Sequence, residues 1–315
     1  MDKGTLTRKI VELAANSSVF IDEPMSRFTS FGIGGPADIV VRPESIDTII
    51  KIASFCRKNR APCRVIGNGT NLLVGDGGIR GVVLMLGGNI NQMRKDRNNI
   101  IAGAGAALSD LAVYARDNGL SGLEFSFGIP GTVGGAVLMN AGAYGREMKD
   151  VVMRTVFLDG KGNIGVLDAA SHQFGYRRSC FQDGKSVILE AEFVLQPGDK
   201  AEIGSRMDEY MAKRRDSQPV DMPSAGSVFR RPELEGTFVG PMVEECGLKG
   251  CQIGGARVSE KHAGFIVNAG GATAEDVLAL IALIRRHVKK KFSVNLETEI
   301  KVMGVRVKER NEEGL

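Results

Sequence analysis

Two glycine-rich stretches place the tightest limit on how this chain can fold, because so much bare backbone suits neither a stable helix nor a long strand. VIGNGTNLLVGDGG spans residues 65–78, and FGIPGTVGGAV spans residues 127–137. Glycine has no Cβ, so it permits positive φ and lets backbone N–H groups approach a ligand closely. A single such stretch is most simply a tight turn or a packed corner. Two of them, each after a strand-like run, favour a bound cofactor.

Neither stretch fits the common nucleotide-binding signatures. GNGTNL and GAGAAL begin as G-x-G but place leucine where the Rossmann fingerprint needs its third small residue, and the P-loop pattern is absent from the sequence. The chain has no G-x-S-x-G motif, and His172, His262 and His287 lie far apart in the sequence. A standard NAD or P-loop domain, a serine-hydrolase triad and a histidine-rich metal site are therefore disfavoured.

Composition indicates a folded protein with a mild positive charge. The chain has 315 residues, 43% of them hydrophobic, which is enough for two domains with their own cores. Its 41 Lys and Arg against 37 Asp and Glu give a net charge of +4, spread along the chain rather than massed. This balance does not require a nucleic-acid partner, and it is compatible with an anionic small ligand.

Cysteine spacing and hydropathy predict a cytoplasmic protein. The five cysteines are odd in number and show no CxxC or Cys/His zinc spacing, so we expect free thiols in a reducing compartment and no bound metal. Residues 1–20 are charged and amphipathic without an apolar signal core, and no apolar run approaches membrane-spanning length. We expect no membrane insertion.

Strand and helix patterns alternate over the first two hundred residues. Strands are expected at residues 37–43, 63–67, 81–86, 151–159, 163–168 and 187–195. A helix is expected at residues 45–59, with one apolar face made by Ile46, Ile49, Ile50 and Ala53. A second helix is expected at residues 109–118, with Ser109 as its N-cap and Gly119 just past its end.

A Pro-Gly pair in residues 196–200, QPGDK, marks a candidate domain boundary. The last helix is expected at residues 274–292, with Thr273 and Asp276 as a capping pair. Its apolar face is predicted to hold Val277, Leu280, Ile281, Ile284 and Val288. The basic run at 285–291 is most simply its solvated C-terminal end. These patterns predict an α+β protein with domains at 1–195 and 196–304 and a tail at 305–315.

Seven segments, taken in order, resemble one enzyme family. They are SRFTSFGIGGPADIVV, GNGTNLLV, FSFGIPGTVGGAVLMNAGAYGREM, FGYRRSCF, PSAGSVFRRP, GCQIGGARVSEKHAGFIVN and LETEIKVMG, and they cover residues 26–304. Together they resemble the UDP-N-acetylenolpyruvoylglucosamine reductases, flavoenzymes of peptidoglycan precursor synthesis. The resemblance implies a two-part FAD-binding domain of the PCMH/vanillyl-alcohol-oxidase type, followed by a smaller α+β substrate-binding domain. The chain is similar to the shorter subclass, which lacks an extra tyrosine-bearing loop.

The resemblance gives both glycine stretches a role in binding FAD. Bare amides of the first stretch would satisfy pyrophosphate oxygens, and the second would pass beside the flavin. No histidine lies between residues 1 and 147, so a histidine tether to FAD is not expected and the cofactor should be non-covalent. The implied FAD-binding residues are Gly67, Asn68, Gly69, Thr70, Asn71, Leu72, Pro130, Gly131, Thr132, Gly134, Gly135, Ala136, Asn140, Ala141, Gly142, Ala143 and Arg214.

Three residues from separate segments are implied to be catalytic. In the family, Arg177 would face the enolpyruvyl carboxylate, Ser227 would donate a proton, and Glu299 would face the same carboxylate in its protonated form. Each has an ordinary alternative as surface polarity, a turn residue or a solvent-facing strand residue. Glu297 lies two residues from Glu299 on the same expected strand face, so the choice between them rests on the motif alone.

The implied reaction is a ping-pong reduction. NADPH would reduce FAD and leave, after which UDP-N-acetylglucosamine enolpyruvate would be reduced to UDP-N-acetylmuramate. Tyr176, Arg230, Lys261 and His262 are candidate substrate contacts that are equally open to structural roles, and so is Arg214. Arg231 departs from the asparagine that some members carry, so the individual substrate contacts there stay open.

Two other functions account for part of the sequence. A flavin oxidase that uses oxygen would explain the glycine stretches but not AGSVF or LETEIK. A flavin- or sugar-nucleotide-binding regulator without turnover would leave Arg177, Ser227 and Glu299 unexplained. We expect a monomeric enzyme.

Overall fold

The computed structural model describes residues 1–233 and 236–305, so all but the first residue of the expected 305–315 tail lie outside the described residues. The chain forms two compact units. Unit 1 comprises Met1–Ile21, Ile39–Asn68 and Gly81–Arg214, and unit 2 comprises Asp22–Asp38, Gly69–Arg80 and Arg215–Leu315. Each unit contains helices and strands, which confirms the predicted α+β class.

The compact units differ from the expected division at residue 196. Two short segments of the N-terminal part, Asp22–Asp38 and Gly69–Arg80, belong to unit 2. Most of the helix that follows the Pro-Gly pair belongs to unit 1. Turn-forming residues mark where the chain can change direction, but they do not specify which elements pack together. The compact units are therefore built from several separate segments, and a single boundary at residue 196 does not describe them.

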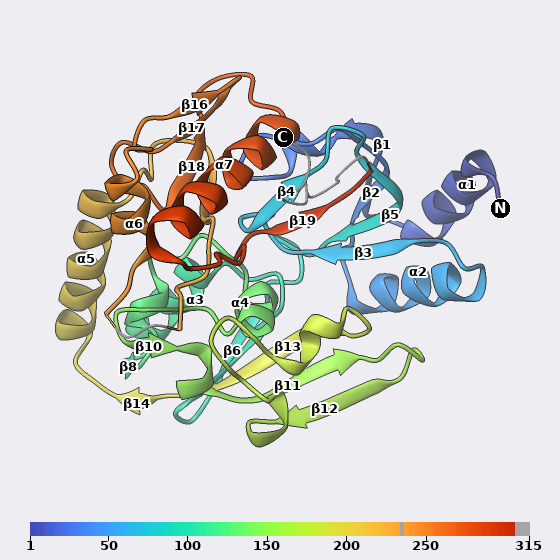
Figure 1. Ribbon diagram of the computed structural model, residues 1–315. Helices are drawn as coiled ribbons and strands as arrows, with labels where there is room; N and C mark the ends of the chain where they lie inside the picture. The colour runs from blue at the N-terminus through green and yellow to red at the C-terminus, as the bar shows by residue number, and fades with distance from the viewer. Residues whose placement is uncertain (234–235, 306–315) are drawn as a thin grey trace. The chain divides into compact units, whose positions relative to one another are not determined.

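One sheet has the strand order β1-β2-β5-β3. The helices α1 and α2 pack against each other (Figure 1). β3 and β5 are parallel, with Cys63 opposite Val82. The elements are α1 (Lys3–Ala14), β1 (Ser18–Pro24), β2 (Pro36–Arg42), α2 (Ile46–Lys58), β3 (Cys63–Ile66) and β5 (Ile79–Met85).

A second, antiparallel sheet in unit 1 has the order β12-β11-β13-β7-β6. The helix α4 packs against its central strand β13 (Figure 1). A two-stranded sheet pairs β8 with β14. The elements are β6 (Met93–Asp96), β7 (Asn99–Gly103), α3 (Leu108–Asp117), β8 (Leu120–Ser121), α4 (Val133–Met139), β11 (Val152–Leu158), β12 (Ile164–Asp168), β13 (Val187–Val194), β14 (Gln196–Pro197) and α5 (Lys200–Ser217).

Unit 2 is built on an antiparallel sheet of order β15-β18-β17-β16, against which α7 packs (Figure 1). β19 pairs in parallel with β4. The elements are β4 (Leu72–Val74), β15 (Ser224–Ser227), α6 (Val239–Glu245), β16 (Gln252–Ile253), β17 (Ala256–Val258), β18 (Phe265–Asn268), α7 (Ala274–Phe292) and β19 (Lys301–Met303). The remaining short elements are η1 (Met25–Arg27), η2 (Glu124–Ser126), β9 (Gly142–Ala143), β10 (Arg146–Glu147), η3 (Met148–Asp150), η4 (Ala170–His172) and η5 (Cys180–Asp183).

The helix positions are confirmed, but one predicted cap is wrong and the predicted apolar face of α2 is only partly correct, because the buried residues of that helix are Thr48, Ile49, Ile52 and Cys56. All five apolar residues predicted for the last helix are buried in α7. In α2, Ile49 is buried, while Ile46, Ile50 and Ala53 are partly buried against the same core. Gly119 follows the C-cap of α3 with a φ of 66°, as expected.

The Ser109 N-cap is wrong. Ala107 occupies the N-cap of α3, and Ser109 lies inside the helix with its hydroxyl 3.3 Å from a carboxylate oxygen of Asp110. A tertiary contact sets the start of this helix, because Ala107 forms a β-bridge with Thr132 and the Leu108 N–H donates to the Gly131 carbonyl.

The N-terminus of α7 is held by two sets of acceptors. Thr273 and Asp276 form the predicted capping box. In addition, the Asp76 carboxylate accepts from the backbone N–H of Ala274 at 2.9 Å and of Glu275 at 3.2 Å. Asp76 belongs to the GDGG end of the first glycine stretch, so that end serves the fold of unit 2.

Replacing Asp76 with alanine should lower the free energy of unfolding by about 1–2 kcal/mol, because two helix N–H groups lose a charged acceptor at the positive end of α7. Asp76→Asn keeps one acceptor oxygen without the charge, so its loss should be smaller. Urea unfolding of the three proteins measures both losses. Equal losses in the two variants would contradict a hydrogen-bonding role for this carboxylate.

His172 is buried in the segment that precedes Tyr176 and Arg177. Its ring lies 3.1 Å from the Thr155 hydroxyl and stacks on Phe174 with centroids 4.7 Å apart. Burial lowers the pKa of His172 below its usual value, and the same holds for His262. Both rings are therefore held in the neutral form in the folded protein.

Stability should fall as the pH drops below about 6.5, the pKa of an unfolded histidine. In that range the unfolded chain binds protons that the folded chain excludes, at a cost of up to about 1.4 kcal/mol per pH unit for each histidine. Urea unfolding at about pH 7.5 and about pH 5.5 checks this sign. His172→Gln should show a smaller difference between the two pH values, and an unchanged difference would argue against His172 as the source.

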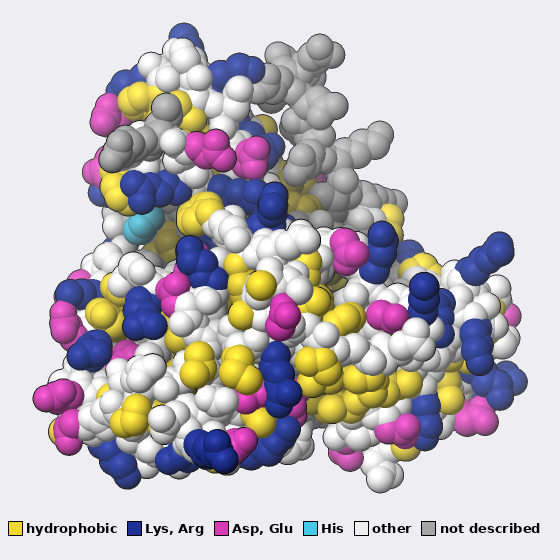
Figure 2. Space-filling view, turned by 90° about the horizontal axis from the view of Figure 1, so that it is seen from below, with side chains coloured by type: hydrophobic (Ala, Val, Ile, Leu, Met, Phe, Trp, Pro, Cys, Tyr) yellow, Lys and Arg dark blue, Asp and Glu magenta, His cyan; other side chains and the backbone are white. Residues whose placement is uncertain are grey.

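Other expectations about composition can be compared with the described part of the chain. All five cysteines are free thiols, as expected. Among residues 1–233 and 236–305, no helix has the length and apolar character needed to cross a bilayer, and no three His, Cys, Asp or Glu residues gather into a metal-binding group. On the face drawn in Figure 2, Lys and Arg side chains are interspersed with Asp and Glu, in line with the small net charge.

Candidate active site

The two glycine stretches meet within unit 1. Gly67, which follows β3, faces Thr132 so closely that a Cβ on Gly67 would lie 2.3 Å from the Thr132 hydroxyl oxygen. Gly134 packs against Ala104, where a Cβ would lie 3.0 Å from the alanine Cβ. A side chain at Gly67 would collide with the Thr132 hydroxyl, and one at Gly134 would press against Ala104, so both positions favour glycine. The first stretch then continues into unit 2 at Gly69, which has a φ of 65°.

The second stretch is fixed at both ends of α4. Thr132 is the N-cap, and its hydroxyl accepts from the Gly135 N–H at 3.3 Å. Asn140 ends the helix in the left-handed region with a φ of 44° and is fully buried. Its side chain donates to the Glu147 carboxylate at 2.9 Å and to the Gly175 carbonyl at 3.0 Å. The side chain of Asn140 thereby joins the second stretch to the segment that carries Tyr176 and Arg177.

Arg177 lies against the segment that follows the second stretch. Its guanidinium donates to the Gly142 carbonyl at 3.1 Å and lies 5.0 Å from the centroid of the Tyr176 ring. The backbone at Arg177 is left-handed, with a φ of 53°, and its carbonyl accepts from the Gln182 side chain at 2.8 Å. A half-buried cation with this backbone support is positioned to meet an anion beside the glycine stretch.

Arg214 approaches the same stretch from α5. A Cβ on Gly128 would lie 3.0 Å from the Arg214 Cδ, and burial lowers the pKa of Arg214. Nearby, the rings of Tyr144 and Tyr210 stack with centroids 4.2 Å apart, and the Tyr144 hydroxyl donates to the Tyr210 carbonyl at 2.7 Å. This stack joins the segment that follows the second stretch to α5, the helix that carries Arg214.

In unit 2, backbone hydrogen bonds bring the segments of Ser227 and Glu299 together. The Glu299 N–H donates to the Val228 carbonyl at 2.8 Å, and Phe229 forms a β-bridge with Thr298. The Ser227 hydroxyl donates to the Phe229 carbonyl at 3.3 Å, which is a long bond for a hydroxyl. Ser227 therefore lies at the end of β15, and its neighbour Val228 is hydrogen-bonded to the backbone of Glu299.

The expected strand around Glu299 is only partly present. Thr298 makes an isolated bridge and β19 begins at Lys301, so Glu299 lies between two short pairings and not on a continuous strand. The two glutamates also differ in environment. The Glu297 side chain is 76% exposed and pairs with Arg230 at 3.5 Å, whereas Glu299 is half-buried. The difference in burial favours Glu299 over Glu297 as the residue of a binding site.

Arg230 and Lys301 place positive charge near Glu299. The Nε of Arg230 is buried and has no hydrogen-bond partner in the described residues. The pKa of Lys301 is lowered, first by burial and then by Arg230, while Glu299 acts in the opposite direction. Sequence reasoning did not single out Lys301. The available signal was its position two residues after Glu299 in the LETEIK motif.

His262 lies beside Ser227, and the Lys261 side chain is hydrogen-bonded to a backbone carbonyl. A Cβ on Gly264 would lie 2.9 Å from the His262 Cε1 and 3.7 Å from the Ser227 hydroxyl, so both side chains lie over Gly264. The Gly264 N–H donates to Nδ1 of His262 at 3.1 Å, which leaves the proton of the neutral ring on Nε2. The Lys261 ammonium donates to the Arg215 carbonyl.

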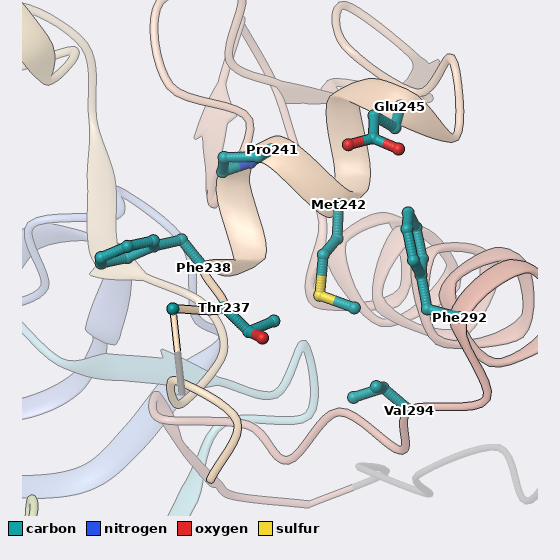
Figure 3. A pocket seen from close by; sticks show the side chains of 8 residues that line it. Thr237, Phe238, Pro241, Met242, Glu245, Phe292 and Val294 are labelled. Atoms are coloured by element: carbon teal, nitrogen blue, oxygen red, sulfur yellow. The ribbon is translucent and has the colours of Figure 1, made fainter. Parts of the chain in front are cut away.

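A surface pocket of about 330 Å³ lies in unit 2 but is separate from these residues (Figure 3). Met242, Phe292 and Val294 line it with apolar side chains. Its remaining lining residues are Gly236, Thr237, Phe238, Pro241 and Glu245. None of the residues predicted for catalysis, cofactor or substrate lines this pocket.

The predicted site residues thus form one group in each unit. In unit 1, the start of the first stretch, the second stretch, Tyr176, Arg177 and Arg214 come together, whereas Gly69, Thr70, Asn71 and Leu72 belong to unit 2. In unit 2, Ser227, Glu299, Arg230 and His262 surround the end of β15. The first group offers backbone amides and two guanidinium groups, and the second offers a hydroxyl, a carboxyl and further cations.

Comparison with known proteins finds family matches in both parts of the chain. Residues 218–303 match the family described as "UDP-N-acetylenolpyruvoylglucosamine reductase, C-terminal domain", and residues 37–168 match "FAD binding domain". A UDP-N-acetylenolpyruvoylglucosamine reductase from Syntrophomonas wolfei is 47% identical over 94% of this chain and 98% of its own length. This chain belongs to that family. The relative from Caldanaerobacter subterraneus is also 47% identical, over 95% of this chain and 98% of its own.

A solved structure of the family agrees with the fold. The UDP-N-acetylenolpyruvylglucosamine reductase of Thermus caldophilus has a TM-score of 0.76 and 36% identity, covering 91% of this chain and 98% of its own. The predicted resemblance is therefore confirmed over nearly the full chain. The roles of individual residues are not compared in these matches and stay predictions.

Proposed function

We propose that this protein is an FAD-dependent oxidoreductase that reduces UDP-N-acetylglucosamine enolpyruvate to UDP-N-acetylmuramate with NADPH, in peptidoglycan precursor synthesis. The observation that carries the proposal is family membership at 47% identity over 94% of the chain. The meeting of the two glycine stretches in unit 1 supports it independently. A cytoplasmic location and a monomeric state remain predictions.

The residues of unit 1 fit FAD. At Gly67 there is no room for a Cβ. Arg214 lies against the second stretch at Gly128, and Arg177 lies against Gly142, which follows that stretch. Backbone amides and guanidinium groups suit a pyrophosphate, and the lack of side chains lets a flat ring approach the main chain. When bound, FAD would carry hydride from NADPH to the enolpyruvyl group. The residues proposed to hold it are those at 67–72, 130–132, 134–136 and 140–143, with Arg214; of these, residues 69–72 belong to unit 2.

Arg177 is proposed to bind the enolpyruvyl carboxylate. A guanidinium offers paired donors in a fixed plane that match a carboxylate. Negative charge builds on this carboxylate and its neighbouring carbon as the double bond is reduced. A cation fixed by the Tyr176 ring and the Gly142 carbonyl stabilises that charge without reorganising.

Ser227 and Glu299 of unit 2 are proposed to act on the same substrate. Ser227 would donate a proton to the carbanion-like carbon, which is basic enough to accept it from a hydroxyl held within reach. Its long bond to the Phe229 carbonyl leaves the hydroxyl able to turn toward substrate. Glu299 would face the substrate carboxylate. Arg230, whose buried Nε has no partner among the described residues, is proposed to bind the sugar nucleotide together with Tyr176, Lys261 and His262.

The test follows flavin absorbance in the purified protein without oxygen. We expect NADPH to bleach the flavin band and UDP-N-acetylglucosamine enolpyruvate to restore it. Recovery with oxygen but not with the sugar nucleotide would replace the proposal with a flavin oxidase. Protein that cannot take up FAD would refute flavoenzyme function altogether.

A further inference from the structure

Asn71 joins the first glycine stretch to the segment that carries Glu299. Both residues are half-buried and belong to unit 2. The Asn71 side-chain amide donates to the Glu299 carbonyl at 3.3 Å. The Asn71 carbonyl accepts from the Lys301 N–H at 2.9 Å. Asn71 therefore holds two backbone groups of this segment, one on each side of Ile300.

Two segments hold the backbone of Glu299, one at each of its polar groups. The Glu299 N–H donates to the Val228 carbonyl at 2.8 Å, and the Glu299 carbonyl accepts from Asn71. The next residue, Ile300, is 2% exposed in the core of unit 2. Neighbouring side chains of an extended chain point to opposite sides. The Glu299 side chain is therefore directed away from that core.

The pairing of β19 with β4 explains why a side chain makes the second contact. Leu72 is the first residue of β4 and pairs with Lys301. The chain before it changes direction at Gly69, which has a φ of 65°, so the backbone pairing starts only at Leu72. An amide side chain offers the same N–H donor as a peptide group. Asn71 thus continues the support of β4 as far as Glu299.

We propose, on the basis of the function proposed above, that Asn71 is a positioning residue for Glu299. Its hydrogen bond restrains the peptide unit after Glu299 and so fixes the direction in which the carboxyl leaves the backbone. That carboxyl is proposed to face the substrate carboxylate, where a displacement of about 1 Å can cost about 100-fold in rate. Residues 69–72 would then serve both FAD and the placement of Glu299.

The test measures the two half-reactions of Asn71→Ala by stopped-flow absorbance without oxygen, with FAD at a concentration that fully loads the protein. We expect the rate of sugar-nucleotide reduction to fall about 10–100-fold. The reduction of FAD by NADPH should keep its rate, because Glu299 is proposed to act only on the substrate carboxylate. Asn71→Asp keeps the shape of the side chain but places a charged acceptor against the Glu299 carbonyl, so its loss should be at least as large.

A double-mutant cycle separates positioning from any other role of Asn71. Glu299→Ala leaves no carboxyl to position, so adding Asn71→Ala to it should change the remaining rate by no more than about 2-fold. If Asn71→Ala lowered the rate by the same factor with and without the Glu299 carboxyl, the amide would act elsewhere and the proposal would be overturned.

Hydrogen–deuterium exchange of the backbone tests the same contact without turnover. Exchange at residues 298–301 of the FAD-loaded protein should be faster in Asn71→Ala than in the wild type. Asn89→Ala is the matched control, because Asn89 is also half-buried and its amide donates to the Arg42 carbonyl at 3.3 Å, within unit 1. This variant should leave exchange at 298–301 and sugar-nucleotide reduction unchanged.

Two failures can be told apart in these experiments. Wild-type protein that binds FAD but does not reduce the sugar nucleotide would refute the proposed function, and the role of Asn71 with it. Wild-type protein that reduces the sugar nucleotide, with unchanged exchange at 298–301 in Asn71→Ala, would overturn only the role of Asn71.

Discussion

Replacing Ser227 with alanine should lower the rate of sugar-nucleotide reduction by about 10²–10⁴-fold while leaving the reduction of FAD by NADPH unchanged. The reason is that only the second half-reaction needs a proton at carbon. Stopped-flow absorbance without oxygen measures the two half-reactions separately. The substrate dissociation constant should change little, because the lost hydroxyl acts mainly in the transition state.

Ser224→Ala provides the matched control for this prediction. Ser224 begins the same strand, and its hydroxyl lies 3.5 Å from the Gly226 N–H. This variant should keep both rates. Equal losses in the two variants, or a loss of NADPH oxidation in Ser227→Ala, would indicate a disturbed strand and would refute Ser227 as proton donor.

The parts of the fold that depend on local patterns could be predicted from sequence. In α7, the helical period and the Thr273–Asp276 box act within a few residues, so the buried face and the capping were both correct. The second acceptor at that terminus comes from Asp76, 198 residues away from Ala274. No local pattern could connect them. The Ser109 cap failed for the same reason, because a bridge to Thr132 sets the start of α3.

The candidate site shows the same limit. Motifs located Arg177, Ser227 and Glu299, but the contacts that support them join distant segments, such as the hydrogen bond from Arg177 to the Gly142 carbonyl. The glycine count predicted close backbone approach, not which segments approach. The LETEIK motif places Lys301 two residues after Glu299, but Lys301 was missed because its burial and its proximity to Arg230 cannot be read from that motif.

Gly67→Ala should raise the dissociation constant of FAD by about 10–100-fold. The new Cβ would lie 2.3 Å from the Thr132 hydroxyl oxygen, which is shorter than the contacts that Cβ atoms make in proteins. Thr132 would have to turn away, and α4 would lose its N-cap bond to Gly135, worth about 1 kcal/mol. The two stretches would also move apart, which disturbs the proposed pyrophosphate and flavin contacts together. Fluorescence titration of the apoprotein with FAD measures the change.

A double-mutant cycle separates this steric effect from a general loss of stability. Thr132→Ala removes both the cap and the clashing oxygen, so adding Gly67→Ala to it should cost much less than adding Gly67→Ala to the wild type. Gly184→Ala is the control, because Gly184 has a φ of 71° but nothing within 4 Å of its missing Cβ. It carries the backbone strain of alanine without a clash, so FAD affinity should be retained. Additive effects at Gly67 and Thr132 would show that their contact does not govern FAD binding, and the explanation of the glycine stretches by close approach would fail.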